Sequence, residues 1–218
     1  MTAQTEFAHE QMVNQQIRAG DVLDDRALNV LRSVPRERFV PSSWRDLAFA
    51  DTAVALPAGQ RMLPPVIIGR ILQALELAAD DRVLEVGSGS GYLSACMAQQ
   101  AESVCSLELH AEVADFARSN LAATGTRGVE VLTKNAYEFV AQDSYDAIVL
   151  TGSLPVADAR FQQWLVPGGR LFAVVGTGSS MDAQLIQRLK PDQFVIRSLF
   201  ETAIPALEHA RQVDAFVF

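Results

Sequence analysis

The sequence predicts an α/β fold, in which a mostly parallel β-sheet carries a helical cap formed by the N-terminal third. Three observations predict it. From residue 82 onward, short apolar runs alternate with segments of helical periodicity, the pattern of parallel strands joined by crossover helices. A glycine-rich turn follows the first of these strands. Residues 8–77 instead show helical spacing interrupted by prolines, which favours helices and loops over strands.

The cap is expected to contain three helices, over residues 12–19, 24–31 and 67–75, because apolar side chains recur there three or four positions apart. The pair Pro64-Pro65 precedes the third helix, where proline is tolerated. Residues 32–60 contain three prolines and are expected to be extended and loop-like. The apolar face of the third helix needs a partner surface, so we expect the cap to pack on the carboxyl end of the sheet.

The core alternates regularly from residue 81 to the end. Strands are expected at 83–86, 104–109, 129–132, 145–150 and 170–175, and helices at 93–100 and 112–122. Three further strand-like segments, 184–189, 194–196 and 215–218, are expected to form an antiparallel edge. We therefore expect a seven-stranded sheet with the strand at Val83 central, in one domain over residues 1–218. Within it, residues 1–80 form the cap and residues 81–218 the ligand-binding core.

Composition excludes several classes of protein. The 218 residues are 49% hydrophobic and 20% charged, which is ordinary for a globular domain and argues against disordered and fibrous proteins. Lys and Arg number 18 against 26 Asp and Glu, for a net charge of −8. An acidic surface repels phosphate backbones, so no nucleic-acid partner is expected. Without a membrane-length apolar run or an apolar signal segment, and with only two cysteines, a cytoplasmic location without a membrane partner is expected.

The strongest motif is the run from Val83 to Tyr92. Its strand leads directly into Gly87, Gly89 and Gly91. Glycine allows a sharp turn and a close approach of ligand to main chain, and ligands of open α/β sheets bind outside the carboxyl ends of the strands. A dinucleotide-binding fingerprint needs glycine at the position that Tyr92 occupies, and a P-loop needs Gly-Lys-Ser/Thr, which is absent here. Neither of these two motifs is therefore present. The remaining common function is S-adenosylmethionine binding in the Rossmann-like class I methyltransferase fold; the alternative is a structural turn without ligand.

Polar side chains stand where the predicted strands end. Glu108 ends the second strand, and its carboxylate can accept hydrogen bonds from both ribose hydroxyls. Asn135 follows the third strand and offers a carbonyl oxygen to the adenine amino group, unless it is simply a turn residue. Glu85 can meet the cationic amino group of the ligand, or solvent. The predicted cofactor-binding residues are Glu85, Gly87, Ser88, Gly89, Gly91, Glu108, Leu109, Asn135 and Ala136. The histidines show no ligand spacing, so no metal site is expected.

With these residues assembled, the chain resembles the protein-L-isoaspartate O-methyltransferase family over nearly its full length. The resemblance rests on the core run from Val83 and on N-terminal pieces at 12–16, 34–41 and 47–51, together with the pair Gly59-Gln60. It implies the class I methyltransferase fold, S-adenosylmethionine as cofactor, and the carboxylate of a damaged, isoaspartyl protein or peptide as methyl acceptor. The chain is expected to be a monomer or a weak dimer.

The acceptor segment departs from the pattern of that family. The family usually follows Gly-Gln with Thr-Ile-Ser-Gln-Pro, whereas this chain has Arg61-Met62-Leu63 before its two prolines. A carboxylate acceptor with a pKa of about 3.9 is ionised at neutral pH and needs no general base. The segment is expected to orient it, with Arg61 as a bidentate donor, unless Arg61 simply points to solvent, and with Leu63 as an apolar wall. Arg61 and Leu63 are the predicted catalytic-site residues. Loss of the hydroxyls leaves two alternatives open: a same-fold methyltransferase with another acceptor, or a non-catalytic S-adenosylmethionine-binding protein.

Overall fold

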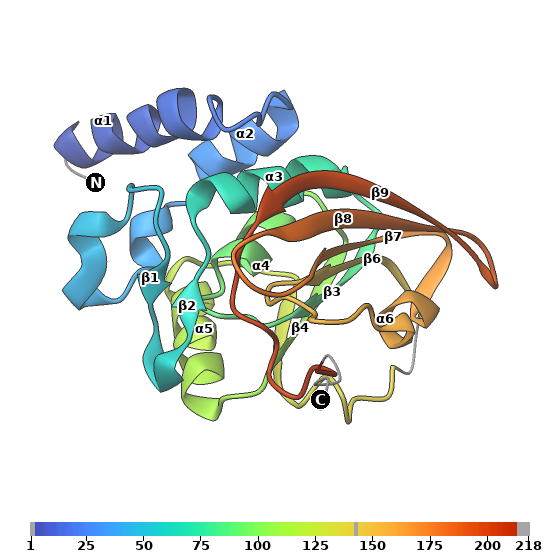
Figure 1. Cartoon of the computed structure of the whole chain (residues 1–218). Helices are drawn as coiled ribbons and strands as arrows, with labels where there is room; N and C mark the ends of the chain where they lie inside the picture. Colours follow the sequence, from blue (N-terminus) through green and yellow to red (C-terminus); the bar gives the residue numbers. More distant parts are fainter. Residues whose placement is uncertain (1–2, 142–143, 213–218) are drawn as a thin grey trace.

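The computed structural model describes residues 3–141 and 144–212 (Figure 1). The N-terminal third contains α1 (Ala3–Gln11), the π-helical turn η1 (Met12–Ile17), α2 (Asp25–Ser33), the 3₁₀ turns η2 (Arg36–Arg38) and η3 (Ser42–Leu47), β1 (Val54–Ala55), η4 (Pro57–Gly59), β2 (Arg61–Met62) and α3 (Pro65–Leu75). The remainder contains β3 (Arg82–Val86), α4 (Tyr92–Met97), β4 (Ser103–Glu108), α5 (Ala111–Ala123), β5 (Val129–Thr133), β6 (Tyr145–Leu150), α6 (Ala159–Gln163), β7 (Leu165–Val175), β8 (Met181–Lys190) and β9 (Gln193–Thr202).

The strands from β3 to β9 form one sheet of seven strands, in the order β5-β4-β3-β6-β7-β8-β9. Neighbours from β5 to β7 are parallel, and β8 and β9 add an antiparallel edge. The prediction of a mostly parallel seven-stranded sheet is confirmed. The strand at Val83 is interior, between β4 and β6, although the middle strand of the seven is β6. The segment 215–218, expected as an edge strand, lies outside the described residues.

Alternate residues of each strand face two separate hydrophobic cores. On one face Val83 and Val149 pack in the cluster that includes the helices of the N-terminal third, α4 and α5. On the other face Leu84 and Ile148 pack in a smaller cluster with Phe161 of α6. A strand places successive side chains on opposite faces, and a parallel sheet covered on both faces therefore needs continuous apolar runs. The core strands have such runs.

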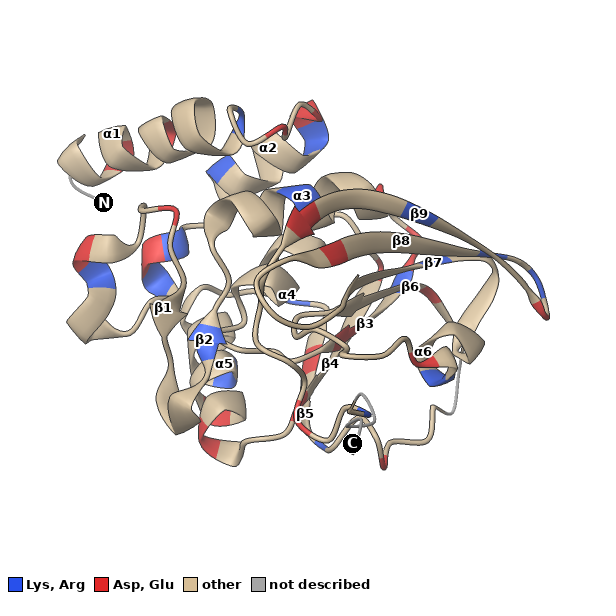
Figure 2. Ribbon diagram, viewed as in Figure 1, with Lys and Arg blue, Asp and Glu red and all other residues tan. Residues whose placement is uncertain are grey.

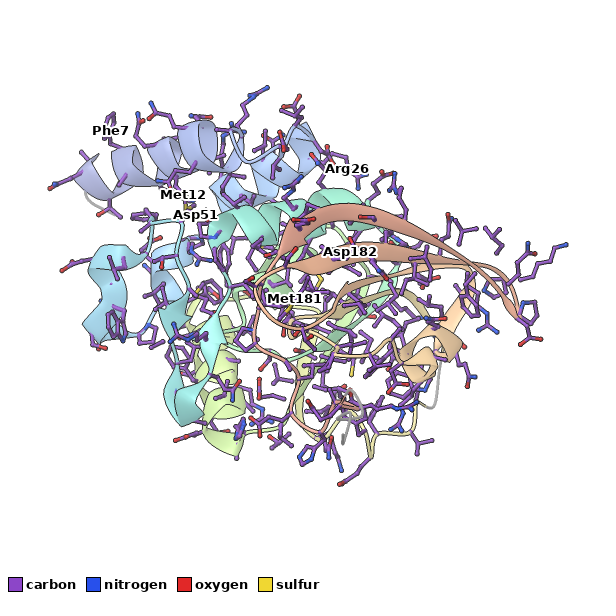
Figure 3. All side chains as sticks on the ribbon, viewed as in Figure 1. Phe7, Met12, Arg26, Asp51, Met181 and Asp182 are labelled. Carbon is purple, nitrogen blue, oxygen red and sulfur yellow. The ribbon has the colours of Figure 1, made fainter. Side chains whose placement is uncertain are left out.

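The N-terminal helix starts at Ala3, nine residues before the expected start, and ends in the π-helical turn η1. Figure 3 shows Phe7 pointing away from the molecule, where it is 66% exposed, whereas Met12 is buried. The contacts of η1 are with α2 and α3. Its buried residues Val13 and Ile17 therefore join this helix to the rest of the cap.

The cap does not sit on the carboxyl end of the sheet as expected. Helix α3 contacts β7 and α4 and lies along one face of the sheet (Figure 1), with Ile71 and Leu72 buried. An amphipathic helix buries more apolar area against a sheet face than against strand ends, where polar backbone groups and loops project. Only the β1–β2 hairpin and the residues that join it to α3 reach the carboxyl ends of the strands.

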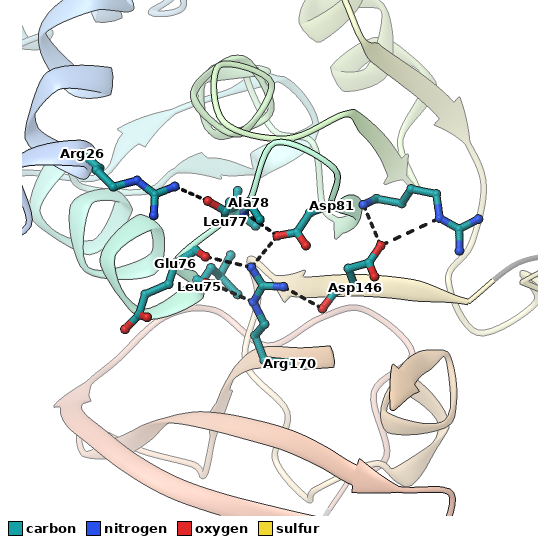
Figure 4. A network of polar contacts seen from close by, with 9 residues as sticks. Arg26, Leu75, Glu76, Leu77, Ala78, Asp81, Asp146 and Arg170 are labelled. Carbon is teal, nitrogen blue, oxygen red and sulfur yellow. Dashed lines mark hydrogen bonds and ion pairs between the residues drawn. The ribbon is translucent and has the colours of Figure 1, made fainter. Parts of the chain in front are cut away.

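Arg170 fastens α3 to the amino ends of the strands (Figure 4). Its guanidinium donates to the backbone oxygens of Leu75 (2.6 Å), Glu76 (3.1 Å) and Asp146 (3.1 Å). It also pairs with the carboxylate of Asp81 at 2.5 Å, and the two side chains are only 16% and 10% exposed. Because an Arg guanidinium presents its donors in a fixed planar fork, this one side chain sets the angle between α3 and the sheet.

Charged side chains of both signs are spread over the helices and strands rather than gathered by sign on one face (Figure 2). With the net charge of −8, this distribution offers no basic stripe of the kind that follows a phosphate backbone. Within residues 3–141 and 144–212, no helix combines the length and the apolar character that a bilayer crossing requires.

Candidate active site

A cleft opens at the carboxyl ends of β3, β4, β5 and β6. This is the edge of the sheet at which the sequence predicts that a ligand binds. The empty space of the cleft, counted together with the open mouth, is about 1070 Å³. Its walls come from the β1–β2 hairpin, the glycine turn, the loops after β4, β5 and β6, and the segment after β9. The lining includes Gln60, Arg61, Leu63, Gly87, Gly89, Glu108, Leu109, His110, Asn135, Ala136, Thr151, Ile204 and Glu208.

The glycine turn forms the floor of the cleft. Gly87 and Gly89 have φ of 95° and 52°, in the left-handed region that favours glycine. A Cβ on Gly87 would lie 2.2 Å from Oγ1 of Thr151, and that hydroxyl donates to the backbone oxygens of Val86 (2.9 Å) and Gly87 (2.8 Å). At Gly89 a Cβ would meet only Leu56, at 3.5 Å. The first glycine is therefore required by the fold, and the second leaves open space above the backbone.

Two of the other predicted loop residues lie beside the cleft rather than on it. Gly91 begins α4, and a Cβ there would meet the backbone oxygen of Ala117 at 3.2 Å, so it makes room for α5 instead of ligand. Ser88 is buried and lines a smaller cavity beneath the loop together with Leu63. Ser88 contributes to the site through the hydrogen bond that its hydroxyl donates to Glu108.

Glu108 is the polar centre of the cleft. It is buried, and its Oε2 accepts hydrogen bonds from the backbone N–H of Gly89 (3.1 Å) and the hydroxyl of Ser88 (3.3 Å). Its Oε1 accepts from the backbone N–H of His110 at 3.2 Å. A carboxylate has about four acceptor positions, so one stays open on Oε1 and the long contact with Ser88 is a second that a ligand hydroxyl can take. Leu109 lines the cleft beside it.

Asn135 lines the cleft and is also a turn residue. Its Oδ1 accepts from the backbone N–H of Tyr137 at 2.9 Å, and its Nδ2 donates to Glu138 at 3.1 Å. This is an Asx turn, so the turn role of Asn135 is confirmed. Its oxygen keeps a second lone pair, and the contact with adenine stays a prediction. Ala136 lies next to it, buried and on the cleft wall.

Glu85 points away from the large cleft. It is fully buried, and its Oε2 accepts hydrogen bonds from the hydroxyls of Ser94 and, at 2.6 Å, Ser106. Its Oε1 has no partner among the described residues. Burial raises the pKa of this carboxyl to about 7, against the lowering effect of the two serine hydroxyls. Glu85 lines the smaller cavity beneath the glycine turn.

The acceptor segment brings a free cation to the cleft. Arg61 is exposed and lines the cleft, and its guanidinium has no hydrogen bond or ion pair within the described part of the chain. Leu63 is buried beside it, and its backbone oxygen is held by a hydrogen bond from Arg36 at 2.9 Å. Arg61 and Leu63 therefore both line the cleft, and their role in orienting a carboxylate stays a prediction.

Sequence reasoning missed three side chains that meet at this mouth. Oε1 of Glu208 is 2.6 Å from Nε2 of His110 and accepts from the amide of Gln60 at 2.9 Å. The hydrogen bond from His110 is the main cause that lowers the pKa of Glu208. His110 stands two residues after Glu108, which was a usable signal. Glu208 lies in an irregular segment with no periodicity to indicate its direction.

Comparison with known proteins shows the family of this chain. The model of the protein-L-isoaspartate(D-aspartate) O-methyltransferase family matches residues 7–210. A protein-L-isoaspartate O-methyltransferase of Methanoculleus marisnigri is 38% identical over 181 residues, covering 82% of each chain. Another, from Rhodopseudomonas palustris strain HaA2, is 39% identical over 188 residues, covering 85% of this chain and 76% of the relative.

A solved structure has the same fold over nearly the whole chain. It is a Plasmodium falciparum protein assigned as a protein-L-isoaspartate O-methyltransferase, in complex with S-adenosyl-L-homocysteine. It superposes with a TM-score of 0.79 at 21% identity, covering 92% of this chain and 98% of that one. The predicted methyltransferase fold, including its N-terminal third, is therefore confirmed.

Proposed function

Because this chain belongs to the protein-L-isoaspartate(D-aspartate) O-methyltransferase family, we propose that its cleft transfers the methyl group of S-adenosylmethionine to the carboxylate of an isoaspartyl residue in a protein or peptide. The observation that carries the proposal is the cleft itself. Its lining combines an open glycine turn and a buried carboxylate, Glu108, with the free guanidinium of Arg61. The glycine turn and Glu108 suit the cofactor, and Arg61 suits an anionic acceptor.

The cofactor half of the cleft fits S-adenosylmethionine. The space above Gly89 has no Cβ to fill it, which allows close contact between the ligand and the backbone. Glu108 takes a ribose hydroxyl at its open acceptor position on Oε1, and a second when the 3.3 Å contact with Ser88 is released. Leu109 and Ala136 provide apolar contact for the base, and the second lone pair of Asn135 Oδ1 accepts from the adenine amino group.

In this proposal Glu85 binds the amino group of the ligand, although Glu85 does not line the large cleft. It is fully buried, and its unpartnered Oε1 borders the small cavity beneath the glycine turn. There it accepts a hydrogen bond from the amino group of the ligand, directly or through water.

The acceptor half needs orientation rather than acid–base chemistry. When bound, S-adenosylmethionine supplies an electrophilic methyl group on a sulfonium, and the sulfur departs as a neutral thioether. The acceptor carboxylate is already ionised at neutral pH, so no residue has to remove a proton. Arg61 binds the carboxylate oxygen that does not react, and Leu63 restricts water beside it. Holding the two reacting atoms in line is the main source of rate.

Labelled S-adenosylmethionine incubated with an isoaspartyl peptide, and with the matched aspartyl peptide as control, tests the proposal. We expect a base-labile methyl ester on the isoaspartyl peptide alone. Equal labelling of both peptides would contradict the specificity, and no labelling despite tight binding of S-adenosylhomocysteine would contradict the activity.

One observation favours a second candidate, a methyltransferase of the same fold with another acceptor. Arg61 and Leu63 stand where the family has hydroxyls, and an unpaired polar substrate group costs about 1–3 kcal/mol. Consumption of the cofactor with a cell extract, but not with isoaspartyl peptides, would identify this candidate. Binding without consumption in either assay would indicate a non-catalytic protein.

A further inference from the structure

Arg36 is a buried charge that the reaction itself does not use. It begins η2 and is 0% exposed. Its Nε donates to the backbone oxygen of Ala48 at 3.0 Å and its Nη2 to that of Leu63 at 2.9 Å. Its Nη1 has no partner, and no carboxylate pairs with it, among the described residues. Burial lowers the pKa of its guanidinium, while the nearby Asp51 acts in the opposite direction.

Stability does not account for this residue. Removing a charge from water is costly unless the charge is paired and fully hydrogen-bonded, and apolar side chains of similar volume are often as stable or more so in such a place. The Nη1 nitrogen of Arg36, with its two N–H donors, has no partner among the described residues. Arg36 contacts three separate segments, and two of these lie at the site.

The first of these two is the acceptor segment. The oxygen of Leu63 that Arg36 holds lies directly after β2, which carries Arg61. The second segment directly follows the glycine turn: the guanidinium lies 4.9 Å from the ring centroid of Tyr92, the first residue of α4 after Gly91. Cation–π contact of this kind is strengthened by burial. Phe39 closes the other side of the ring, with centroids 5.5 Å apart.

We infer that Arg36 is a positioning residue, which sets the distance between the acceptor segment and the glycine turn and thereby aligns the acceptor carboxylate with the methyl donor. The inference rests on the proposed function for its substrate, and on the contacts of Arg36 for its geometry. Arg36 touches neither ligand. Because misplacement of reacting groups by about 1 Å costs up to about a hundredfold in rate, its loss lowers turnover and leaves cofactor binding in place.

The variants Arg36→Met and Arg36→Lys test this, with Arg38→Met as the matched control, since Arg38 lies on the same turn and is exposed. For Arg36→Met we expect kcat on an isoaspartyl peptide to fall by about 10- to 100-fold. The dissociation constant for S-adenosylhomocysteine should change by less than about threefold. Arg36→Lys, which keeps the charge but concentrates its donors on a single nitrogen, should recover part of kcat, and Arg38→Met should resemble the wild type.

Other outcomes overturn the inference. If Arg36→Met loses cofactor binding and melting temperature in proportion to kcat, the role is structural; if its kcat is unchanged, there is no positioning role. If the wild-type protein is inactive on isoaspartyl peptides, this result refutes the proposed function but not the positioning role of Arg36. In that case hydrogen exchange of residues 61–63 decides: faster exchange in Arg36→Met than in Arg38→Met supports the inference, and equal exchange refutes it.

Discussion

Glu208 and His110, 98 positions apart in the sequence, meet at 2.6 Å across the mouth of the cleft. Gln60 donates to the same carboxylate oxygen at 2.9 Å. Through these contacts the segment after β9, the end of β4 and the acceptor segment are joined at one point. The carboxylate is half exposed, so the contact is a weak closure of the cleft that solvent competes for.

Replacement of Glu208 by Gln should reveal this closure in the pH dependence of stability. The folded-state pKa of Glu208 is lowered, mainly by the hydrogen bond from His110. Its contribution is therefore present above the usual pKa of about 4.3 and is lost as the pH falls through the lower folded value. We expect Glu208→Gln to lower the free energy of unfolding by less than about 1 kcal/mol at pH 6, and the difference to vanish in acid. Urea unfolding at several pH values measures this difference.

The control Glu201→Gln, at an exposed carboxylate of β9, should show no such pH-dependent difference. A loss of stability in Glu208→Gln that persists at pH 3 would contradict the assignment.

Glu85 should give the opposite pH dependence. Burial raises its folded pKa from 4.5 to about 7. Between these two values the folded state holds more protons than the unfolded state, so stability falls as the pH rises through this window. We expect the free energy of unfolding of Glu85→Gln, relative to wild type, to rise by on the order of 3 kcal/mol across the window. Urea unfolding at each pH checks this, with the exposed Glu130→Gln as control; parallel stability curves for Glu85→Gln and wild type would show that Glu85 is already ionised when folded.

Glu108→Ala should weaken the binding of S-adenosylhomocysteine. Each hydrogen bond to a charged group contributes about 1.5–3 kcal/mol, so loss of one or two predicts a dissociation constant at least about tenfold higher. Titration calorimetry measures it, and Glu102→Ala, at the exposed residue directly before the same strand, is the control. Unchanged affinity in a folded Glu108→Ala protein would mean that the ribose binds elsewhere.

Gly87→Ala should destabilise the protein through its contact with Thr151. The new Cβ lies 2.2 Å from Oγ1, and alanine at a φ of 95° is itself strained by about 1–3 kcal/mol. Thr151→Ala removes the clashing oxygen and leaves the strain, so the double variant should be more stable than the sum of the single effects predicts. A double-mutant cycle by urea unfolding measures the coupling, expected at about 0.5–3 kcal/mol. Strict additivity would show that the loop relaxes away from Thr151.

The sequence predicted the role of a residue best where that role follows from the position of the residue in a strand or in the turn after it. The βαβ alternation predicted the parallel sheet, because right-handed crossovers leave few topologies for such a chain. The carboxyl ends of parallel strands meet at one edge, so Glu108, Asn135 and the glycine turn were predicted together from their positions alone.

Only the tertiary structure decided which side chains from distant loops meet. Nothing periodic relates Gln60, His110 and Glu208, and the direction of each depends on loop paths rather than on a helical or strand period. The burial of Arg36 and Glu85 likewise depends on neighbours from other segments, because the energy of a buried charge is set by the hydrogen-bond donors and acceptors packed around it. The sequence by itself determined the elements and the edge at which ligands bind, and long-range packing determined which polar atoms at that edge are free to bind them.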